Sequence, residues 1–368
     1  MQVRWSVKVV AIAIAGGTIF AIGLTLIGSD NRHAKPMLKG LNTWHVKTLF
    51  TIGDSLPSLD QPYQPVGIPD GIGALSLTDT TVRVFVNHEL VKQAGYEYQL
   101  KNGTRLTGAR VSFFDLDRTS LTIVNSGMAY DAIHDRQGTP VTQASQINEK
   151  GNSRFGFSRF CSSHLIQAGT YNFMDTIYFT GEEALDPPVH PHGGTLWALD
   201  VQSQTLHAVP AAGRMSLENI APLHTAQGHT AFLISDDSLP QSQEPNLVAE
   251  IAHRTTPANQ IVSAPLWLYI GTINATDSDM KRIHLDGNEM TDHAFLNRNG
   301  LLIGDLFYFV ADHSVRRVSQ FKGTGNMTSG TWKRISVRDV SKAGQPGHDG
   351  FGYKNGFTLR REAQAGGA

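Results

Sequence analysis

The residues best suited to chemistry in this chain are acidic side chains at the ends of short apolar strands. Four runs share this pattern, and a fifth run at 266–271 has the strand without the acid; the four are residues 82–89, 176–183, 230–237 and 306–313. Carboxylates brought together raise one another's pKa until some protonate or a cation binds. Carboxylate oxygens suit calcium, and a thiolate added to them suits iron or zinc. The pattern therefore predicts a metal site wherever the fold joins these ends.

The spacing of these runs indicates the elements that would position the acids. Their starts, with the fifth run included, lie about 94, 54, 36 and 40 residues apart, which is typical of propeller blades if the first gap holds two blades or an insertion. Partner strands ending in an aspartate turn, at 109–115 and 195–200, make each pairing a meander. The innermost strands of a propeller point at one central channel, so acidic ends such as Glu89 and Asp237 would face one another. We predict an all-β fold, a β-propeller of five to seven blades, with helix confined to the N-terminal apolar segment.

The overall composition limits the classes of function. The 368 residues include 31 Lys and Arg against 32 Asp and Glu, for a net charge of −1, so no global charge draws the chain to nucleic acid or an anionic membrane. Glycine is abundant at 36 residues, which favours many tight turns between short strands. The sequence has no nucleotide-binding glycine motif, no Gly-x-Ser-x-Gly elbow and no Cys-x-x-Cys pair. Dinucleotide chemistry, serine-hydrolase chemistry and structural zinc are therefore disfavoured.

The N-terminus has the pattern of a targeting segment. Arg4 and Lys8 precede an uncharged, mostly apolar run at 9–29, in the order typical of a secretory signal. The run is also close to the roughly 20 residues that span a bilayer, so an uncleaved membrane anchor is equally open. We predict a signal peptide or anchor at 1–29, one exported propeller domain at 30–360 and a flexible tail at 361–368.

Three further side chains have two interpretations each. Cys161 is the single cysteine, so it forms no disulfide within the chain, and its thiol is either buried and inert or chemically used. Arg159 and Arg214 are candidate catalytic residues that clamp a phosphate, because a guanidinium matches phosphate oxygens in a fork. Surface salt bridges would explain either arginine equally well.

Five short motifs occur in an order that resembles the PhoX-type alkaline phosphatase family. The motifs are IPDGIGA at 68–74, VNHE at 86–89, RFCS at 159–162, TGEE at 180–183 and GRMSLEN at 213–219. The resemblance runs from about Ile68 to Asp237, which is roughly half of the chain. The resemblance implies a propeller with iron and calcium ions at the mouth of its channel.

The resemblance also implies the residues that would hold the ions. Cys161 would bind iron, and the carboxylates would come from Glu89, Glu218 and one of Glu182 and Glu183. Successive side chains of a strand point to opposite faces, so only one of the paired glutamates can face the channel, and the sequence leaves open which.

These observations favour a metal-dependent hydrolase that acts on a small phosphate ester, either a monoester or a diester. Two alternatives stay open. A calcium-dependent lactonase or esterase would use the same acidic channel without Cys161. A non-enzymatic, calcium-stabilised propeller would bind a partner or a polymer. Metal analysis separates them, because iron together with calcium is expected only for the first.

Overall fold

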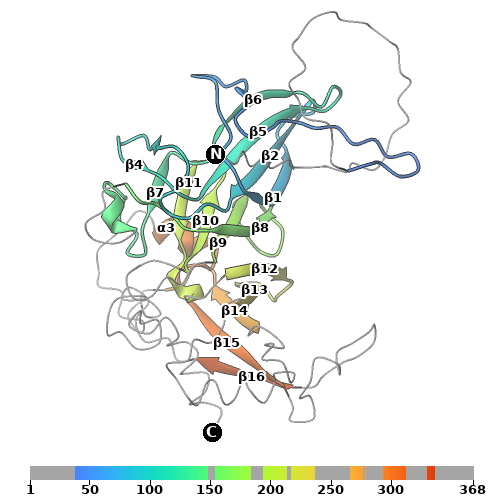
Figure 1. Ribbon diagram of the computed structural model, residues 1–368. Coiled ribbons are helices and arrows are strands. Elements are labelled where there is room, and N and C mark those ends of the chain that lie inside the picture. Colours follow the sequence, from blue (N-terminus) through green and yellow to red (C-terminus); the bar gives the residue numbers. More distant parts are fainter. Residues whose placement is uncertain are drawn as a thin grey trace, which may run out of the picture.

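The computed structural model describes residues 38–147, 154–183, 194–213, 217–236, 266–276, 278, 293–311 and 330–335. In this part of the chain most residues with regular structure belong to three mainly antiparallel sheets, which follow one another from the N-terminal to the C-terminal side (Figure 1). The predicted signal or anchor at 1–29 and the predicted tail at 361–368 lie outside the described residues. None of the helices among the described residues has the length and apolarity to cross a membrane.

Each sheet has four or five strands, most of them joined as meanders. In spatial order, the first sheet contains β1 (Pro69–Ser76), β2 (Thr81–His88), β5 (Arg110–Asp117) and β6 (Ile123–Met128). The middle sheet contains β7 (Ala132–His134), β11 (Thr205–Ala208), β10 (Leu196–Asp200), β9 (Ile177–Glu182) and β8 (Phe160–Ile166), with β7 parallel to β11. The third contains β12 (Leu217–Leu223), β13 (His229–Asp236), β14 (Leu266–Thr272), β15 (Gly304–Ala311) and β16 (Gly330–Ile335).

Smaller elements complete the described structure. A two-stranded ribbon pairs β3 (Tyr98–Gln99) with β4 (Arg105–Leu106), and single 3-10 turns cover Ala144–Gln146 and Pro210–Ala212. One short helix, α3 (His293–Arg298), buries Phe295 and Leu296 against the core shared by the middle and third sheets. The prediction that helix is confined to the N-terminal segment is therefore wrong, because α3 is too short to show a helical period in the sequence.

Of the two aspartate turns predicted for the partner strands, the one at Asp200 is present and the one at Asp115 is wrong. Asp115 is buried within β5, where Arg83 donates to its carboxylate (2.7 and 2.9 Å), and β5 continues to Asp117. β5 pairs with β2 and β10 pairs with β9, as the sequence indicated. Asp117 Oδ1 accepts hydrogen bonds from the backbone N of Thr119 (3.0 Å) and Ser120 (2.7 Å) at the end of β5. Asp200 accepts one from Gln202 N (3.0 Å) at the end of β10. These aspartates form turns, because a short carboxylate satisfies the donors of a chain reversal.

Two inner strands of the middle sheet, β9 and β10, are buried on both faces, which explains their mainly apolar sequences. Every residue of β9 and β10 is buried. Tyr178 packs on Phe85 of the first sheet with ring centroids 5.2 Å apart, and the next residue, Phe179, packs on Phe232 of the third at 6.0 Å. Consecutive residues of β9 therefore pack against the two neighbouring sheets, one on each side, because their side chains point to opposite faces.

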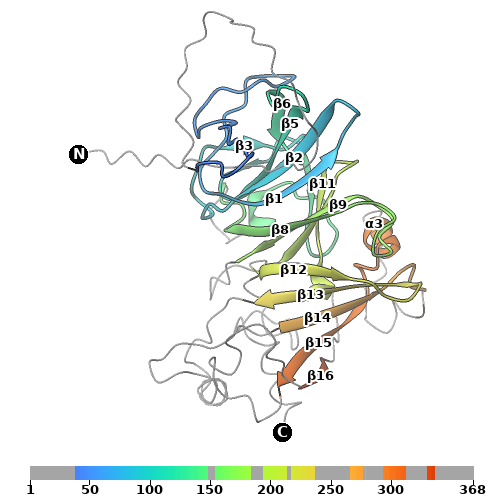
Figure 2. The same cartoon turned by 90° about the vertical axis from the view of Figure 1, so that its right-hand side faces the viewer.

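The three sheets meet along their edge strands β1, β8 and β12, which lie next to one another (Figure 2). Two glycines make this close approach possible. A Cβ atom on Gly71 would lie 2.5 Å from Ser163 N, and one on Gly181 would lie 2.4 Å from Leu217 Cβ. Both distances are shorter than van der Waals contact, so a side chain at either position would push the sheets apart.

Three details differ from the sequence-based expectation. The strands with acidic ends, β2, β9 and β13, lie one strand in from the meeting edge, not at it. The runs at 230–237, 266–271 and 306–313 fall in one sheet, not in successive blades. The described residues form three such sheets without a closed ring, so the expected propeller of five to seven blades is not seen. Strand period alone cannot tell whether the next strand joins the same sheet or begins a new one.

Candidate metal centre

Each of the three meeting strands has an irregularity in its register at the end of its ladder. The irregularities fall between Pro69 and Ile72 in β1, between Phe160 and Ser163 in β8, and between Leu217 and Asn219 in β12. The first residue inside each is a candidate metal ligand, namely Asp70, Cys161 and Glu218. A bulge redirects a side chain out of the regular alternation of a strand. In each sheet, the same kind of register irregularity therefore turns one residue with a possible metal ligand out of the regular alternation of the strand.

Two further carboxylates come from the ends of the neighbouring strands. Glu89 follows β2, and its N donates to Ile68 O (2.8 Å); Glu183 follows β9, and its N donates to Arg159 O (2.9 Å). The two acceptor residues also share a left-handed backbone, with φ of 50° at Ile68 and 56° at Arg159. The first and middle sheets therefore present their glutamates through the same local structure.

The four carboxylate side chains converge on the sulfur of Cys161. Its Sγ lies 3.4 Å from Asp70 Oδ2 and 3.7 Å from Glu218 Oε2. One ligand atom from each of Glu89, Cys161 and Glu183 also lies within 4.8 Å of the other two. The structure thus brings together Glu89, Cys161, Glu183 and Glu218 as the sequence suggested, and adds Asp70. Their role as metal ligands stays a prediction.

The two adjacent glutamates have different environments. Glu182 is fully buried, and its carboxylate accepts hydrogen bonds from Ser158 N (3.0 Å) and Trp197 Nε1 (3.4 Å). It points into the interior of the middle sheet, whereas Glu183 points towards Cys161. Of the two candidates, the structure places Glu183 and not Glu182 in the cluster, because alternation along the strand separates them.

Arg159 lies directly against this cluster. Its Nε is 3.1 Å from Glu89 Oε1 and its Nη2 is 2.5 Å from Glu183 Oε2. Its side chain is 42% exposed, against 20% for Glu89 and 10% for Glu183. Partial desolvation lowers the pKa of Arg159, but the two carboxylates outweigh it and hold the pKa above its usual value. Arg214 and Asp237, the other predicted site residues, lie outside the described residues.

The charge around Cys161 indicates what the cluster requires. Burial of the thiol raises its pKa well above the usual value, and the charges of Asp70, Glu218 and Glu183 raise it further. A nearby divalent or trivalent cation reverses this effect and stabilises the thiolate. The donor set, four carboxylates and one sulfur, fits calcium through its oxygens and iron through its sulfur.

Asn87 fixes the bulge that carries Cys161, although sequence reasoning did not single it out. Its Nδ2 donates to Cys161 O (2.6 Å), Ser162 O (3.2 Å) and Thr180 Oγ1 (2.8 Å), while its Oδ1 accepts from Tyr178 OH (2.9 Å). Asn87 and Tyr178 are fully buried. Asn87 and Asp70 both stand inside motifs noted in the sequence, but only the fold shows what their side chains contact.

His88, on the face of β2 opposite to Asn87, contacts the segment before Asp70. Its Nδ1 lies 3.3 Å from Gly67 O and its Nε2 lies 2.7 Å from Ser112 Oγ. Burial lowers the pKa of His88 to about 4, so the imidazole is neutral. We assign Nδ1–H as the donor to Gly67 and Nε2 as the acceptor from Ser112. His88 therefore points away from the cluster.

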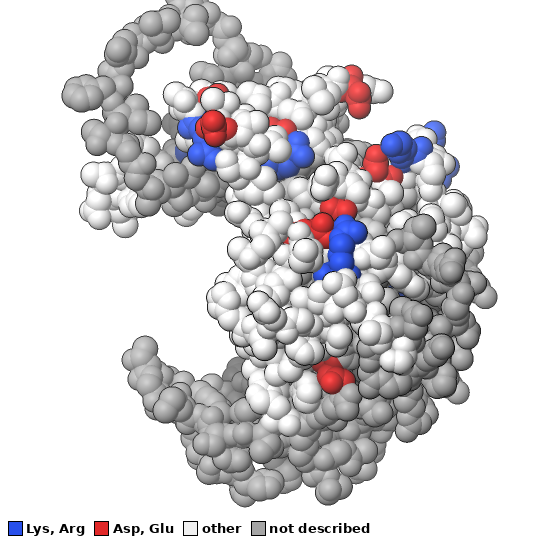
Figure 3. Space-filling model, turned by 180° about the vertical axis from the view of Figure 1, so that it is seen from behind, with Lys and Arg blue, Asp and Glu red and all other residues white. Residues whose placement is uncertain are grey.

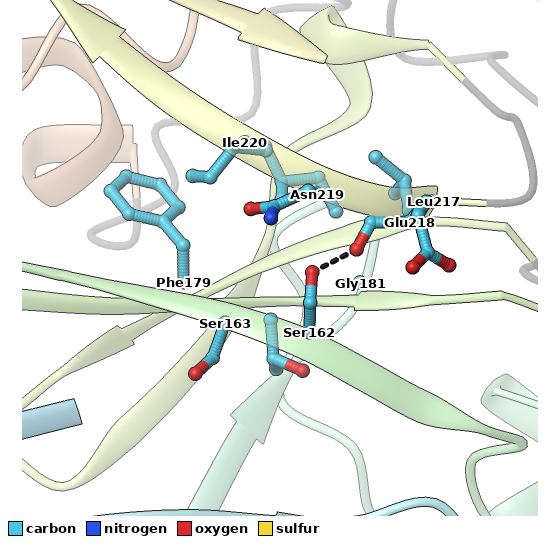
Figure 4. A pocket seen from close by; sticks show the side chains of 10 residues that line it. Ser162, Ser163, Phe179, Gly181, Leu217, Glu218, Asn219 and Ile220 are labelled. Carbon is cyan, nitrogen blue, oxygen red and sulfur yellow. Dashed lines mark hydrogen bonds between the residues drawn. The ribbon is translucent and has the colours of Figure 1, made fainter. Parts of the chain in front are cut away.

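A small crevice lies beside the cluster between β8, β9 and β12 (Figure 4). It encloses about 200 Å³, part of it open, and Phe179, Leu217 and Ile220 line its apolar side. Ser162 Oγ donates a hydrogen bond to Glu218 O across it. Ligand pockets usually hold roughly 300 Å³ or more, so this crevice is mainly a packing contact between β12 and β8.

On the face shown in Figure 3, the described charged side chains lie mostly in small groups of mixed sign.

No protein-family model and no curated protein sequence matches this chain. Among solved structures, the chain is similar to Pseudomonas fluorescens PhoX in complex with vanadate, a transition state analogue. The TM-score is 0.44 with 15% sequence identity, and the match covers 82% of this chain and 54% of that chain. The chain therefore spans about half the length of the PhoX structure.

Proposed function

We propose that this protein is a metal-dependent phosphate-ester hydrolase acting on phosphomonoesters or phosphodiesters. The observation that carries the proposal is the convergence of four carboxylates on one thiol, contributed by three sheets and placed beside an arginine. So much negative charge in a partly buried place favours the binding of a cation. The ordered motifs that contain these residues favour a phosphatase over other metal enzymes.

The residues that would hold the ions follow from the donor set. Asp70, Glu89, Glu183 and Glu218 would provide oxygens for calcium, and Cys161 would provide the sulfur for iron. When bound, such ions supply Lewis-acid polarisation of the phosphoryl oxygens and an acidified water, so the chain needs no serine nucleophile.

The chain itself would bind and orient the substrate through its arginines. The guanidinium of Arg159 is partly exposed at the edge of the cluster, where its planar fork can meet an anionic phosphate. Arg214 is proposed for the same role from its motif. Loss of the arginine that contacts phosphate is expected chiefly to raise KM, because a positioning contact holds substrate and transition state alike.

The test is hydrolysis of a chromogenic phosphate monoester and diester by the purified chain, before and after chelation, with calcium and iron then restored. Activity should disappear on chelation and return only when metal is added. Activity that survives thorough chelation rejects the proposal. A metal-loaded protein that hydrolyses neither ester also rejects it and favours the calcium-stabilised binding protein.

We further propose that the three sheets are blades of a β-propeller and that the chain is exported through the segment at 1–29. The meeting of the edge strands β1, β8 and β12 supports the first point. The charged and apolar order of the N-terminal sequence supports the second. An experimental structure with a closed ring of blades, and a reporter fusion active only outside the cytoplasm, would test them.

A further inference from the structure

Arg159 bridges the first and middle sheets through its backbone as well as its side chain. Its N donates to Leu90 O (2.8 Å), next to Glu89, and its O accepts from Glu183 N (2.9 Å). Its guanidinium contacts the carboxylates of the same two glutamates. Each of the two segments that carry a glutamate therefore makes one backbone hydrogen bond and one ion pair with Arg159.

The guanidinium uses oxygens that belong to the candidate metal cluster. Glu89 and Glu183 each place a ligand atom within 4.8 Å of Cys161 Sγ. A cation drawn to these carboxylates must compete with a positive charge that already contacts both. The equivalent position before β1 is Ile68, an apolar residue that is 46% exposed, so the first sheet has no such charge at this position.

We propose that Arg159 is a positioning residue that acts as a built-in counter-cation, holding Glu89 and Glu183 together and exchanging with a bound metal ion for their oxygens. The inference rests on the proposed function. An ion that takes the carboxylates releases a partly exposed guanidinium beside the site. Ion binding would thereby free the guanidinium of Arg159 to contact an anionic substrate.

This inference predicts changes of opposite sign in two measurements on the full chain. Replacing Arg159 by Gln removes the competing charge, so calcium should bind about tenfold more tightly in titration calorimetry. The same change leaves two acidic side chains unopposed, so the melting temperature of the chelated variant should fall. A loss of general structural integrity would weaken calcium binding instead of strengthening it.

Two further variants sharpen the test. Arg159→Lys keeps the positive charge but lacks the planar pair of N–H donors of the guanidinium. Its calcium affinity should therefore lie between those of the wild type and Arg159→Gln. Arg83→Gln is the matched control, because Arg83 also pairs with a carboxylate, that of Asp115, within the first sheet (2.7 and 2.9 Å). Its melting temperature should fall with no change in calcium affinity.

The outcomes separate this inference from the proposed function. A folded Arg159→Gln variant that binds calcium no more tightly than the wild type overturns the counter-cation role and leaves the hydrolase proposal intact. If that variant does not fold, Arg159→Lys decides the question in the same way. A wild-type chain that binds neither calcium nor iron overturns the hydrolase proposal itself.

Discussion

At the scale of single residues, one position along the chain separates two glutamates with different tasks. Glu182 is enclosed by the middle sheet, where Ser158 N and Trp197 Nε1 donate to it. Glu183 lies with Cys161 and Glu89. Isosteric replacement of each by glutamine therefore separates a role in folding from a role in metal binding.

We expect Glu183→Gln to lose most of its bound metal and nearly all phosphate-ester hydrolysis, because an amide is a poor ligand for a hard cation. Glu182→Gln should keep its metal and lose about 1–2 kcal/mol of unfolding free energy, since the buried donors lose a charged acceptor. Elemental analysis and urea denaturation measure the two effects. The assignment is wrong if Glu182→Gln is the variant that loses metal.

Asn87 has a structural role, because its Nδ2 donates hydrogen bonds to two consecutive carbonyls of the bulge. Asn87→Ala should cost about 2–4 kcal/mol of unfolding free energy, since buried acceptors are left without donors. Tyr178→Phe keeps Asn87 in place and should cost only about 1 kcal/mol. Urea unfolding of both variants checks this order, and an Asn87→Ala variant as stable as the wild type would contradict it.

At the scale of elements, the cluster is built from a repeated arrangement of two strands. A bulge near the start of the edge strand gives the first ligand, and the residue after the neighbouring strand gives the second, as in Asp70 with Glu89 and Cys161 with Glu183. In the third sheet the ladder pairs Leu217 with Asp236, as it pairs Pro69 with His88. Asp237 follows Asp236 in the sequence, so its predicted role is best tested together with Glu218.

The approach of β1 to β8 depends on the missing side chain of Gly71. In Gly71→Ala the added Cβ would lie 2.5 Å from Ser163 N and 2.7 Å from Cys161 O, both backbone atoms that cannot move freely. We expect a loss of about 1–3 kcal/mol in unfolding free energy, because overpacking forces the backbone apart. Metal binding should fall with it, since Asp70 moves away from Cys161.

Gly67→Ala is the matched control for Gly71→Ala. Nothing lies within 4 Å of a Cβ atom at Gly67, so its unfolding free energy should change by less than about 0.5 kcal/mol. Urea denaturation and calcium titration of both variants give the comparison. Equal effects at the two glycines would show that close packing of β1 on β8 is unimportant.

At the scale of the whole molecule, the cluster joins three sheets that also meet through side-chain packing and hydrogen bonds. Phe85 and Tyr178 hold the first to the middle sheet, and Phe179 and Phe232 hold the middle to the third. A bound cation would add direct links between the edge strands of all three. The stability of the assembly should therefore depend on metal.

Removal of metal should lower the melting temperature of the whole chain. A site filled to about a thousand times its Kd adds about 4 kcal/mol to folding, which corresponds to several degrees for a chain of this size. Calorimetric scans with chelator, with calcium, and with calcium and iron measure the shift. A melting temperature unaffected by all three additions would contradict a metal site that joins the sheets.

The sequence by itself determined the β-class of the fold, several strand pairings and most of the ligand-type residues. Short apolar runs bounded by polar residues specify strands, and charged residues at their ends favour positions outside the apolar core. Glu89, Cys161 and Glu218 could be selected for this reason, together with a choice between Glu182 and Glu183.

Only the tertiary structure decided which strands meet, and hence which residues touch. Asp70 and Cys161 are distant in sequence, and they meet because Gly71 lets β1 approach β8 and because bulges break the alternation of both strands. The three sheets, the burial of Glu182 and the contact of Arg159 with two glutamates follow from the same packing. Such contacts depend on side-chain volumes and register across separate sheets, which a local pattern of apolar and polar residues does not encode.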